Sequence, residues 1–146
     1  MEYRNLTAAE IDTLKSHGCS SDDWGSVTVN KELNSDAIYE VHFTGEVHIG
    51  NFNIAGQIHS LKTPGLYHST ISNCTIGDDV RIADVGLLHG YAIGIGTVIE
   101  RTSEISVEGE SGFGNGQTLD VLNEGGGREL MIYDELTSQI AYLIIL

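Results

Sequence analysis

A histidine stands close to a repeated dipeptide in the stretch HGYAIG. His89 precedes Ile93-Gly94 by four residues, and the same dipeptide occurs earlier at Ile76-Gly77. Imidazole titrates near neutral pH, so a surface histidine can take a proton from a reacting hydroxyl or amine. His89 is therefore a residue that could carry out acid–base chemistry. The alternative is that His89 is a surface histidine at a bend of the chain, with no chemical role.

A second group of histidines suggests metal chemistry: His42, His48, His59 and His68. His42 and His59 are separated by one period of the repeat described below, and if the repeat extends that far upstream they lie about 5 Å apart in neighbouring strands. A closed zinc site usually adds cysteine ligands, but Cys19 and Cys74 form no metal-binding pair and are expected to be buried free thiols. We predict no structural metal. Whether His42, His48 and His59 bind an ion is left open.

The composition limits the partners. The 146-residue chain has a formal net charge of −14, with seven Lys and Arg against 21 Asp and Glu. Such a surface repels phosphate backbones and anionic lipids, so nucleic acid and membrane are excluded as partners. The polar start MEYRNLTAAE carries no signal-peptide core, and no apolar run is long enough to span a membrane. These features predict a soluble, cytoplasmic protein.

The N-terminal region has local signals for a helix. In LTAAEIDTLKSHG, residues 6–18, Thr7 can cap the helix and Glu10 can reach back to it, which is a capping box. Trp24 is expected to anchor the following segment on the rest of the protein. The next stretch, SVTVN, alternates in polarity as a strand does.

From about residue 37 the helical period disappears and a shorter repeat takes its place. Large aliphatic residues recur at gaps of five or six, at Ile71, Ile76, Ile82, Leu88, Ile93, Ile99 and Ile105. Three such gaps make one cycle, which gives a 17-residue period, and a further copy starts at Phe113 after a 20-residue step. Upstream, Ile49 and Leu66 are separated by the same period. A sandwich has no reason to keep so short a period, whereas a coil of stacked parallel strands does.

The segments IGDDVR, IADVGL, IGIGTV and FGNGQT resemble the motif of the hexapeptide-repeat proteins. The resemblance is good over residues 66–122 and weaker over 41–65. It implies a mainly β fold: a short left-handed parallel β-helix with an N-terminal helical cap and a C-terminal helix. The opening residues and LNEGGGRE also resemble the N-terminal part of an uncharacterised bacterial hexapeptide-repeat family. The resemblance to this uncharacterised family implies a fold but no reaction.

The resemblance also carries an expected activity. Many hexapeptide-repeat proteins are trimeric acyltransferases, and those acting on UDP-sugars place their catalytic histidine four residues before an aliphatic-Gly corner, as His89 is placed here. The resemblance implies acyl transfer from coenzyme A or another thioester to a small hydroxyl or amino acceptor, with His89 as the general base and Arg81 and Arg101 as cofactor contacts. The alternative is a non-catalytic β-helix for assembly or ligand binding, as a portion of a longer parent protein.

We expect three segments in one compact domain. Residues 1–40 form the helical cap, 41–124 the β-helix, and 125–146 a glycine hinge followed by a helix. The chain stops on the apolar residues LIIL, a surface that needs cover either from the β-helix or from another subunit. A homotrimer with parallel coil axes is the predicted oligomer, with a dimer as the second choice.

Overall fold

The structure is a computed structural model that describes residues 3–53, 62–109, 112, 114–120, 129–133 and 136–145. The described chain is mainly β, as predicted. It divides into two compact units, Met1–Val107 and Glu108–Leu146, which are described separately. Among the described residues, no helix has the length and apolar character needed to cross a membrane.

The first unit begins with the predicted helix and strand. Helix α1 spans Ala8–Ser16, and the capping box is confirmed: the Thr7 hydroxyl accepts from the Glu10 amide while the Glu10 carboxylate accepts from the Thr7 amide. Around it lie β1 (Tyr3–Asn5), β2 (Ser20–Ser21) and β3 (Val27–Asn30), with 3₁₀ turns η1 (Trp24–Ser26) and η2 (Ser35–Ala37). The Trp24 ring packs edge-on against Phe43, which anchors this region on the next strand.

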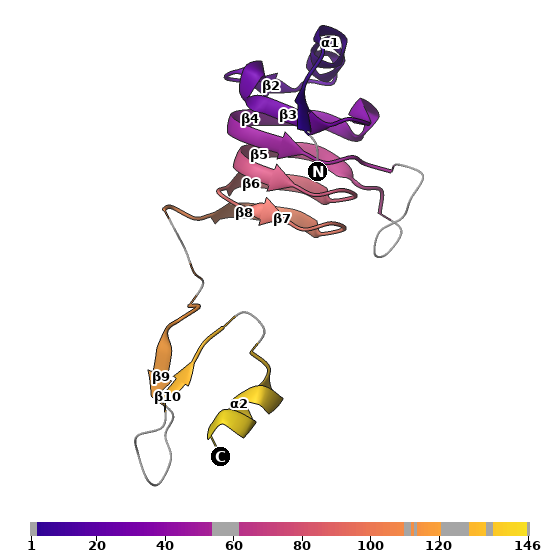
Figure 1. Ribbon diagram of the computed structural model, residues 1–146. Coiled ribbons are helices and arrows are strands. Elements are labelled where there is room, and N and C mark those ends of the chain that lie inside the picture. The colour runs from indigo at the N-terminus through magenta and orange to yellow at the C-terminus, as the bar shows by residue number, and fades with distance from the viewer. Residues whose placement is uncertain are drawn as a thin grey trace. The chain divides into compact units, whose positions relative to one another are not determined.

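Parallel strands stacked one above another make up the body of the first unit (Figure 1). They are β4 (Ile38–Ile49), β5 (Gly65–Ile76), β6 (Arg81–His89), β7 (Ala92–Ile93) and β8 (Val98–Ser106). We call these strands, with β2 and β3, the stack, and residues paired at the same position in successive strands a column. One column runs from Leu66 to Ile82 and on to Ile99, by a 16-residue step and then a 17-residue step. The 17-residue period is thus confirmed over residues 71–106, and the pairs at the start of β5 step by 16 residues instead.

Upstream of residue 65 the predicted register is wrong. Leu66 pairs with Ile38, which lies much further back than one period, and Ile49 pairs with Ile76 rather than Leu66. The step between β4 and β5 is longer because the segment between Ile49 and Gly65 holds more residues than a 17-residue turn requires. A repeat of aliphatic residues cannot reveal an insertion of this kind when Ile49 and Leu66 keep the spacing by coincidence.

The repeated aliphatic residues form the core of the stack. Ile71, Ile76, Ile82 and Leu88 are fully buried, and they belong to a cluster that also includes Phe43. The later members of the same columns are only partly buried: Ile93, Ile99 and Ile105. Burial therefore falls toward β8.

Positive backbone φ angles recur at the spacing of the repeat. Asp84, Gly90, Gly96 and Arg101 have φ between 51° and 79°, so the intervals are 6, 6 and 5 in sequence. The previous turn is marked in the same way by His68, Asn73 and Asp79. A 17-residue turn is thus divided into three segments by residues in the left-handed region, a conformation that glycine adopts without strain and other residues rarely adopt.

One set of bends forms a column of charged residues, Glu40, His68, Asp84 and Arg101, all with positive φ. The His68 ring lies between two carboxylates, with Nδ1 3.2 Å from Asp84 and Nε2 3.6 Å from Glu40. The signs of charge alternate along this column whenever His68 is protonated.

The two ends of the stack differ. At the N-terminal end, β1 pairs antiparallel with β3 and so covers that strand edge. At the other end, β8 is the last strand of the sheet, and no described residue pairs with its outer edge. A strand edge without a partner leaves backbone donors and acceptors open to another chain.

The second unit contains a small antiparallel sheet and a helix. Strand β9 (Thr118–Asp120) pairs with β10 (Glu129–Met131), and α2 spans Ser138–Ile145 inside the predicted C-terminal helix. The sequence had placed residues up to 124 in the coil, whereas the unit boundary falls after Val107 and β9 pairs with β10 instead. Phe113, where the third copy starts, lies outside the described residues.

Candidate functional site

The predicted general base lies near the end of β6, in a column of hydroxyl side chains. Ser72 precedes His89 in this column and Ser106 follows it. His89 is half-buried, and its Nδ1 shares a 2.9 Å hydrogen bond with the Ser72 hydroxyl. Such a bond fixes the ring orientation, and when Nδ1 carries the proton the basic nitrogen is Nε2. The nearest upstream acid, Asp84, contacts His68 instead.

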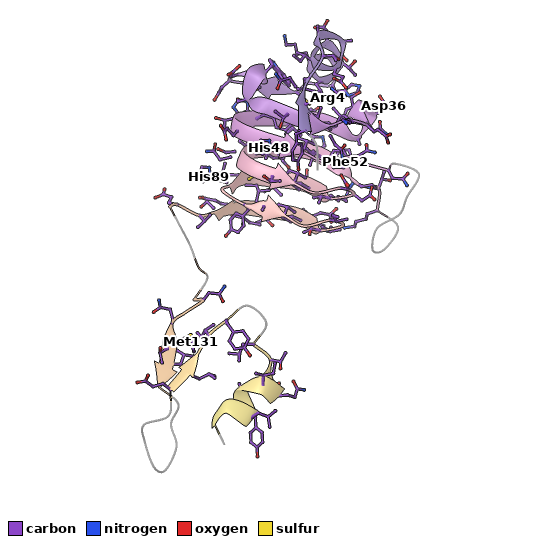
Figure 2. All side chains as sticks on the ribbon, in the orientation of Figure 1. Arg4, Asp36, His48, Phe52, His89 and Met131 are labelled. Carbon is purple, nitrogen blue, oxygen red and sulfur yellow. The ribbon has the colours of Figure 1, made fainter. Side chains whose placement is uncertain are left out.

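The bond between His89 and a hydroxyl is a recurring feature of the stack. His42 shares a bond of 2.9 Å with Ser20, and His48 is hydrogen-bonded to Thr28. In each case the two residues are direct partners in neighbouring parallel strands. Three histidines therefore have the same arrangement, so the Ser72 contact alone does not distinguish His89 as catalytic. Figure 2 shows His48 and His89 in the first unit, and they belong to β4 and β6.

Arg81, a predicted cofactor contact, is already engaged. Its Nε donates to Glu100 at 2.7 Å, Nη1 donates to the Thr63 carbonyl, and the guanidinium lies 4.9 Å from the centre of the Tyr67 ring. Lys62 also donates to Glu100. The hydrogen bonds from Lys62 and Arg81 lower the pKa of the Glu100 carboxyl from 4.5 to about 2. An incoming phosphate would have to compete with this carboxylate for Arg81.

The three predicted site residues do not converge within one chain. Arg81 and His89 stand at opposite ends of β6, with the bend at Asp84 between them. Arg101 follows Asp84 in the column of charged bends and is exposed. Within the described part of the chain Arg101 makes no ion pair. An acyl donor held by both Arg81 and Arg101 beside His89 would therefore require residues from more than one subunit.

The other histidines were considered from the sequence as metal-ligand candidates. The strand neighbours of His42 are Ser20 and Thr70. His59 itself lies outside the described residues. Among the described residues, no three His, Cys, Asp or Glu side chains gather as metal ligands would.

A cleft of about 180 Å³ lies on the stack, at a position that was not predicted from the sequence. It is lined by Glu46, His48, Asn73, Cys74 and Thr75. Of these residues, the sequence had pointed to His48 as a candidate metal ligand and to Cys74 as a buried free thiol. The cleft forms where β4 and β5 fall out of register between Thr44 and Val47. The one usable signal in the sequence was Gly45, because an isolated glycine in a strand suggests a bulge or a close approach.

The two cysteines are buried free thiols. The Cys74 thiol donates to the Ser72 carbonyl, and burial raises the pKa of both the Cys19 and the Cys74 thiols. A thiol held in its protonated form is a poor nucleophile and a poor metal ligand. Neither cysteine is therefore a candidate for catalysis.

Comparison with known proteins places the chain in a family without assigning an activity. An uncharacterized protein of Treponema pallidum (strain Nichols) is 28% identical over 154 residues, a match that covers 97% of this chain and 21% of that protein. The chain thus spans about a fifth of the length of that relative. No solved structure matches this chain. A family model described as a domain of unknown function, DUF4954, matches residues 3–146, and the chain belongs to this family.

Proposed function

We propose that the first unit is a left-handed parallel β-helix of the hexapeptide-repeat type and that the protein is a non-catalytic assembly module. The β-helix is supported by the 16- and 17-residue steps between paired strands and by bends that recur at intervals of five or six in sequence. The handedness rests on the resemblance of IGDDVR and IGIGTV to the hexapeptide motif. An experimental structure that coiled in the opposite hand would contradict it.

The observation that carries the assembly function is the apolar surface of the second unit. Its exposed large side chains are Leu119, Met131, Tyr133, Ile140, Tyr142 and Leu143. Leu130 is the one buried side chain among the described residues of this unit. A segment of this size rarely buries enough surface to be stable without help. We therefore propose that this surface is buried against other copies of the chain, in a homotrimer.

Helix α2 offers the sharpest test of assembly. Tyr142 is 61% exposed and Leu143 69% exposed. Burying two such side chains contributes about 1.5–3 kcal/mol each, so replacing both with serine should weaken the trimer at least about tenfold. Sedimentation velocity on the full chain at micromolar concentration would measure it. Gln139→Ser, on the same helix, is the matched control and should leave the trimer unchanged. A wild-type protein that stays monomeric under these conditions would contradict the proposal.

We also propose that the protein is located in the cytoplasm. Cys19 and Cys74 are both free. Free thiols are usual in a reducing compartment, where disulfides are rare. Fractionation of the native cell, with detection of the protein by antibody, tests this.

Acyl transfer at His89 is the second candidate function. It is favoured by the 2.9 Å contact between His89 Nδ1 and the Ser72 hydroxyl, which orients the ring and leaves Nε2 for proton removal when Nδ1 is protonated. Coenzyme A or another thioester would be the donor, and Arg81 and Arg101 would come from neighbouring subunits. The net charge of −14 stands against an anionic donor.

A paired substitution separates the two functions. His89→Ala should lower thioester-dependent acylation about 10²–10⁴-fold if His89 is the base. His42→Ala removes a histidine with the same kind of hydroxyl contact, to Ser20, and should leave the rate unchanged. An absence of activity with a panel of acyl thioesters and hydroxyl or amino acceptors would reject acyl transfer. Equal losses from both variants would reject His89 as the base.

A further inference from the structure

The cleft beside the register shift has the features of a small binding site. The volume of the cleft is about 180 Å³. Its lining contains a carboxylate, an imidazole, an amide and a hydroxyl, from Glu46, His48, Asn73 and Thr75. No lysine or arginine among the described residues lines it. The site therefore suits a compact polar ligand.

A β-bulge positions Glu46 at this cleft. Residues 45 and 46 of β4 stand opposite Asn73 alone, and the pairing resumes at Val47 with Cys74. The Asn73 side-chain oxygen accepts from the Glu46 amide at 3.0 Å, and a Cβ on Gly45 would lie 2.1 Å from that same oxygen. The backbone here is thus closely fitted to Asn73. Bulges recur beside functional sites because they redirect a side chain out of the strand pattern.

The imidazole of the cleft is held in place from two directions. Nδ1 of His48 is hydrogen-bonded to the Thr28 hydroxyl on β3, and the Tyr3 ring lies 5.1 Å from the imidazole between ring centres. Tyr3 and Thr28 belong to β1 and β3, the strands at the N-terminal end of the stack. A ring fixed in this way binds a ligand with little loss of side-chain freedom.

The charge of the lining selects the kind of ligand. Glu46 is exposed, and its carboxylate makes no ion pair with the described residues. The chain as a whole has a net charge of −14, which attracts cations and repels anions. The carboxylate oxygens of Glu46 and the hydroxyl of Thr75 can both accept hydrogen bonds. An ammonium group supplies a positive charge and three donors, which this lining can receive.

We propose that the cleft binds the primary ammonium group of a small polar molecule, with Glu46 as its ion partner and His48, Asn73 and Thr75 as hydrogen-bonding neighbours. This site is independent of the assembly surface on the second unit and of any reaction at His89. It goes beyond both proposed functions, because neither requires a ligand between β4 and β5.

Titration of the full ¹⁵N-labelled chain with ethanolamine tests the proposal. Ethylene glycol is the matched neutral probe, since it replaces the ammonium group with a second hydroxyl. Ethanolamine should cause saturable shifts at the amides of Glu46, Asn73 and Thr75. Ethylene glycol should bind at least about tenfold more weakly, because hydrogen bonds to charged groups are the stronger ones.

Two variants assign the contacts. Glu46→Gln keeps the side-chain size and should weaken ethanolamine binding at least about tenfold. Glu32→Gln, at an exposed acid elsewhere on the first unit, makes the same change of charge and should leave the affinity unchanged. Thr75→Val keeps the strand preference while removing the hydroxyl, so it should weaken binding without unfolding the chain. Retained amide dispersion in each spectrum checks the fold.

Three results would overturn the proposal. Equal affinity for ethanolamine and ethylene glycol would show that the charge is not recognised. Equal effects of Glu46→Gln and Glu32→Gln would show diffuse attraction to an acidic protein. No saturable shift at the cleft amides would show that the cleft does not bind an ammonium group. None of these results bears on the oligomeric state, so the assembly function is tested separately.

Discussion

The fall in burial toward β8 predicts that the same substitution has different costs in different strands. Ile82 and Ile99 occupy one column, whose previous member is Leu66. Ile82 is fully buried between its two neighbours, whereas Ile99 is partly exposed at the last strand of the sheet. Replacing each with alanine removes the same atoms from two different surroundings.

The magnitudes follow from what surrounds each side chain. Truncating a buried isoleucine to alanine costs about 2–5 kcal/mol, and the cost grows with the cavity left behind. Ile82→Ala should lie near the middle of this range, at about 3–4 kcal/mol, because strands pack on both sides of it. Ile99→Ala opens no closed cavity and should cost about half as much, at about 1–2 kcal/mol.

Urea unfolding followed by circular dichroism measures both costs from the shift in midpoint at constant m value. Ile95→Ala is the control, since Ile95 is 68% exposed and should change the free energy of unfolding by less than about 0.5 kcal/mol. Equal costs for Ile82→Ala and Ile99→Ala would refute the reasoning. They would mean that Ile99 is as well covered in solution as Ile82 is.

Three further perturbations test the bulge, the ion cluster and the thiols. Gly45→Ala should destabilise the fold by at least about 2 kcal/mol in thermal unfolding, because φ is +65° there and the added Cβ would collide with Asn73; a neutral effect would disprove the bulge geometry. The hydrogen bonds that lower the pKa of Glu100 stabilise the fold above pH 4.5. This contribution is about 1–2 kcal/mol after allowance for solvent, and it should be lost as the pH falls from 4.5 toward 2. The difference in stability between wild type and Glu100→Gln should therefore shrink across that interval, and a constant difference would contradict the ion cluster. Cys19 and Cys74 should react with a thiol reagent at neutral pH far more slowly in the native protein than in urea, since burial raises the pKa of both thiols; equal rates would mean that they are exposed.

The parts of the fold that the sequence predicted depend on local or strictly periodic signals. The capping box at Thr7 and Glu10 is local, so it could be identified from four residues. The pairing of Ile82 with Ile99 follows from a regular 17-residue step. The pairing of Ile49 was wrong because the step between β4 and β5 is longer, and nothing in the aliphatic pattern marks an insertion.

The candidate site was less predictable because it depends on where the chain bends. Ser72 and His89 are paired 17 residues apart, so the period is consistent with their contact, but Ser72 was not named from the sequence. Between Arg81 and His89 the chain bends at Asp84, which has φ +55°; aspartate adopts such angles more often than most other non-glycine residues, but that preference is too weak to locate a bend from the sequence. The cleft depends on one extra residue in β4, and the resulting position of Glu46 is visible only when β5 is placed beside it.

The column of charged bends has a consequence for how the stack avoids misassembly. Misassembly between similar segments is a characteristic failure of repeat proteins. Here a stack that omitted β5 would bring Glu40 against Asp84, and one that omitted β6 would bring His68 against Arg101. Like charges in contact are unfavourable, whereas the native order puts an opposite charge beside each ionised group. When His68 is protonated, the alternation of charge therefore favours pairing of each strand with its native neighbour over pairing with the next similar strand.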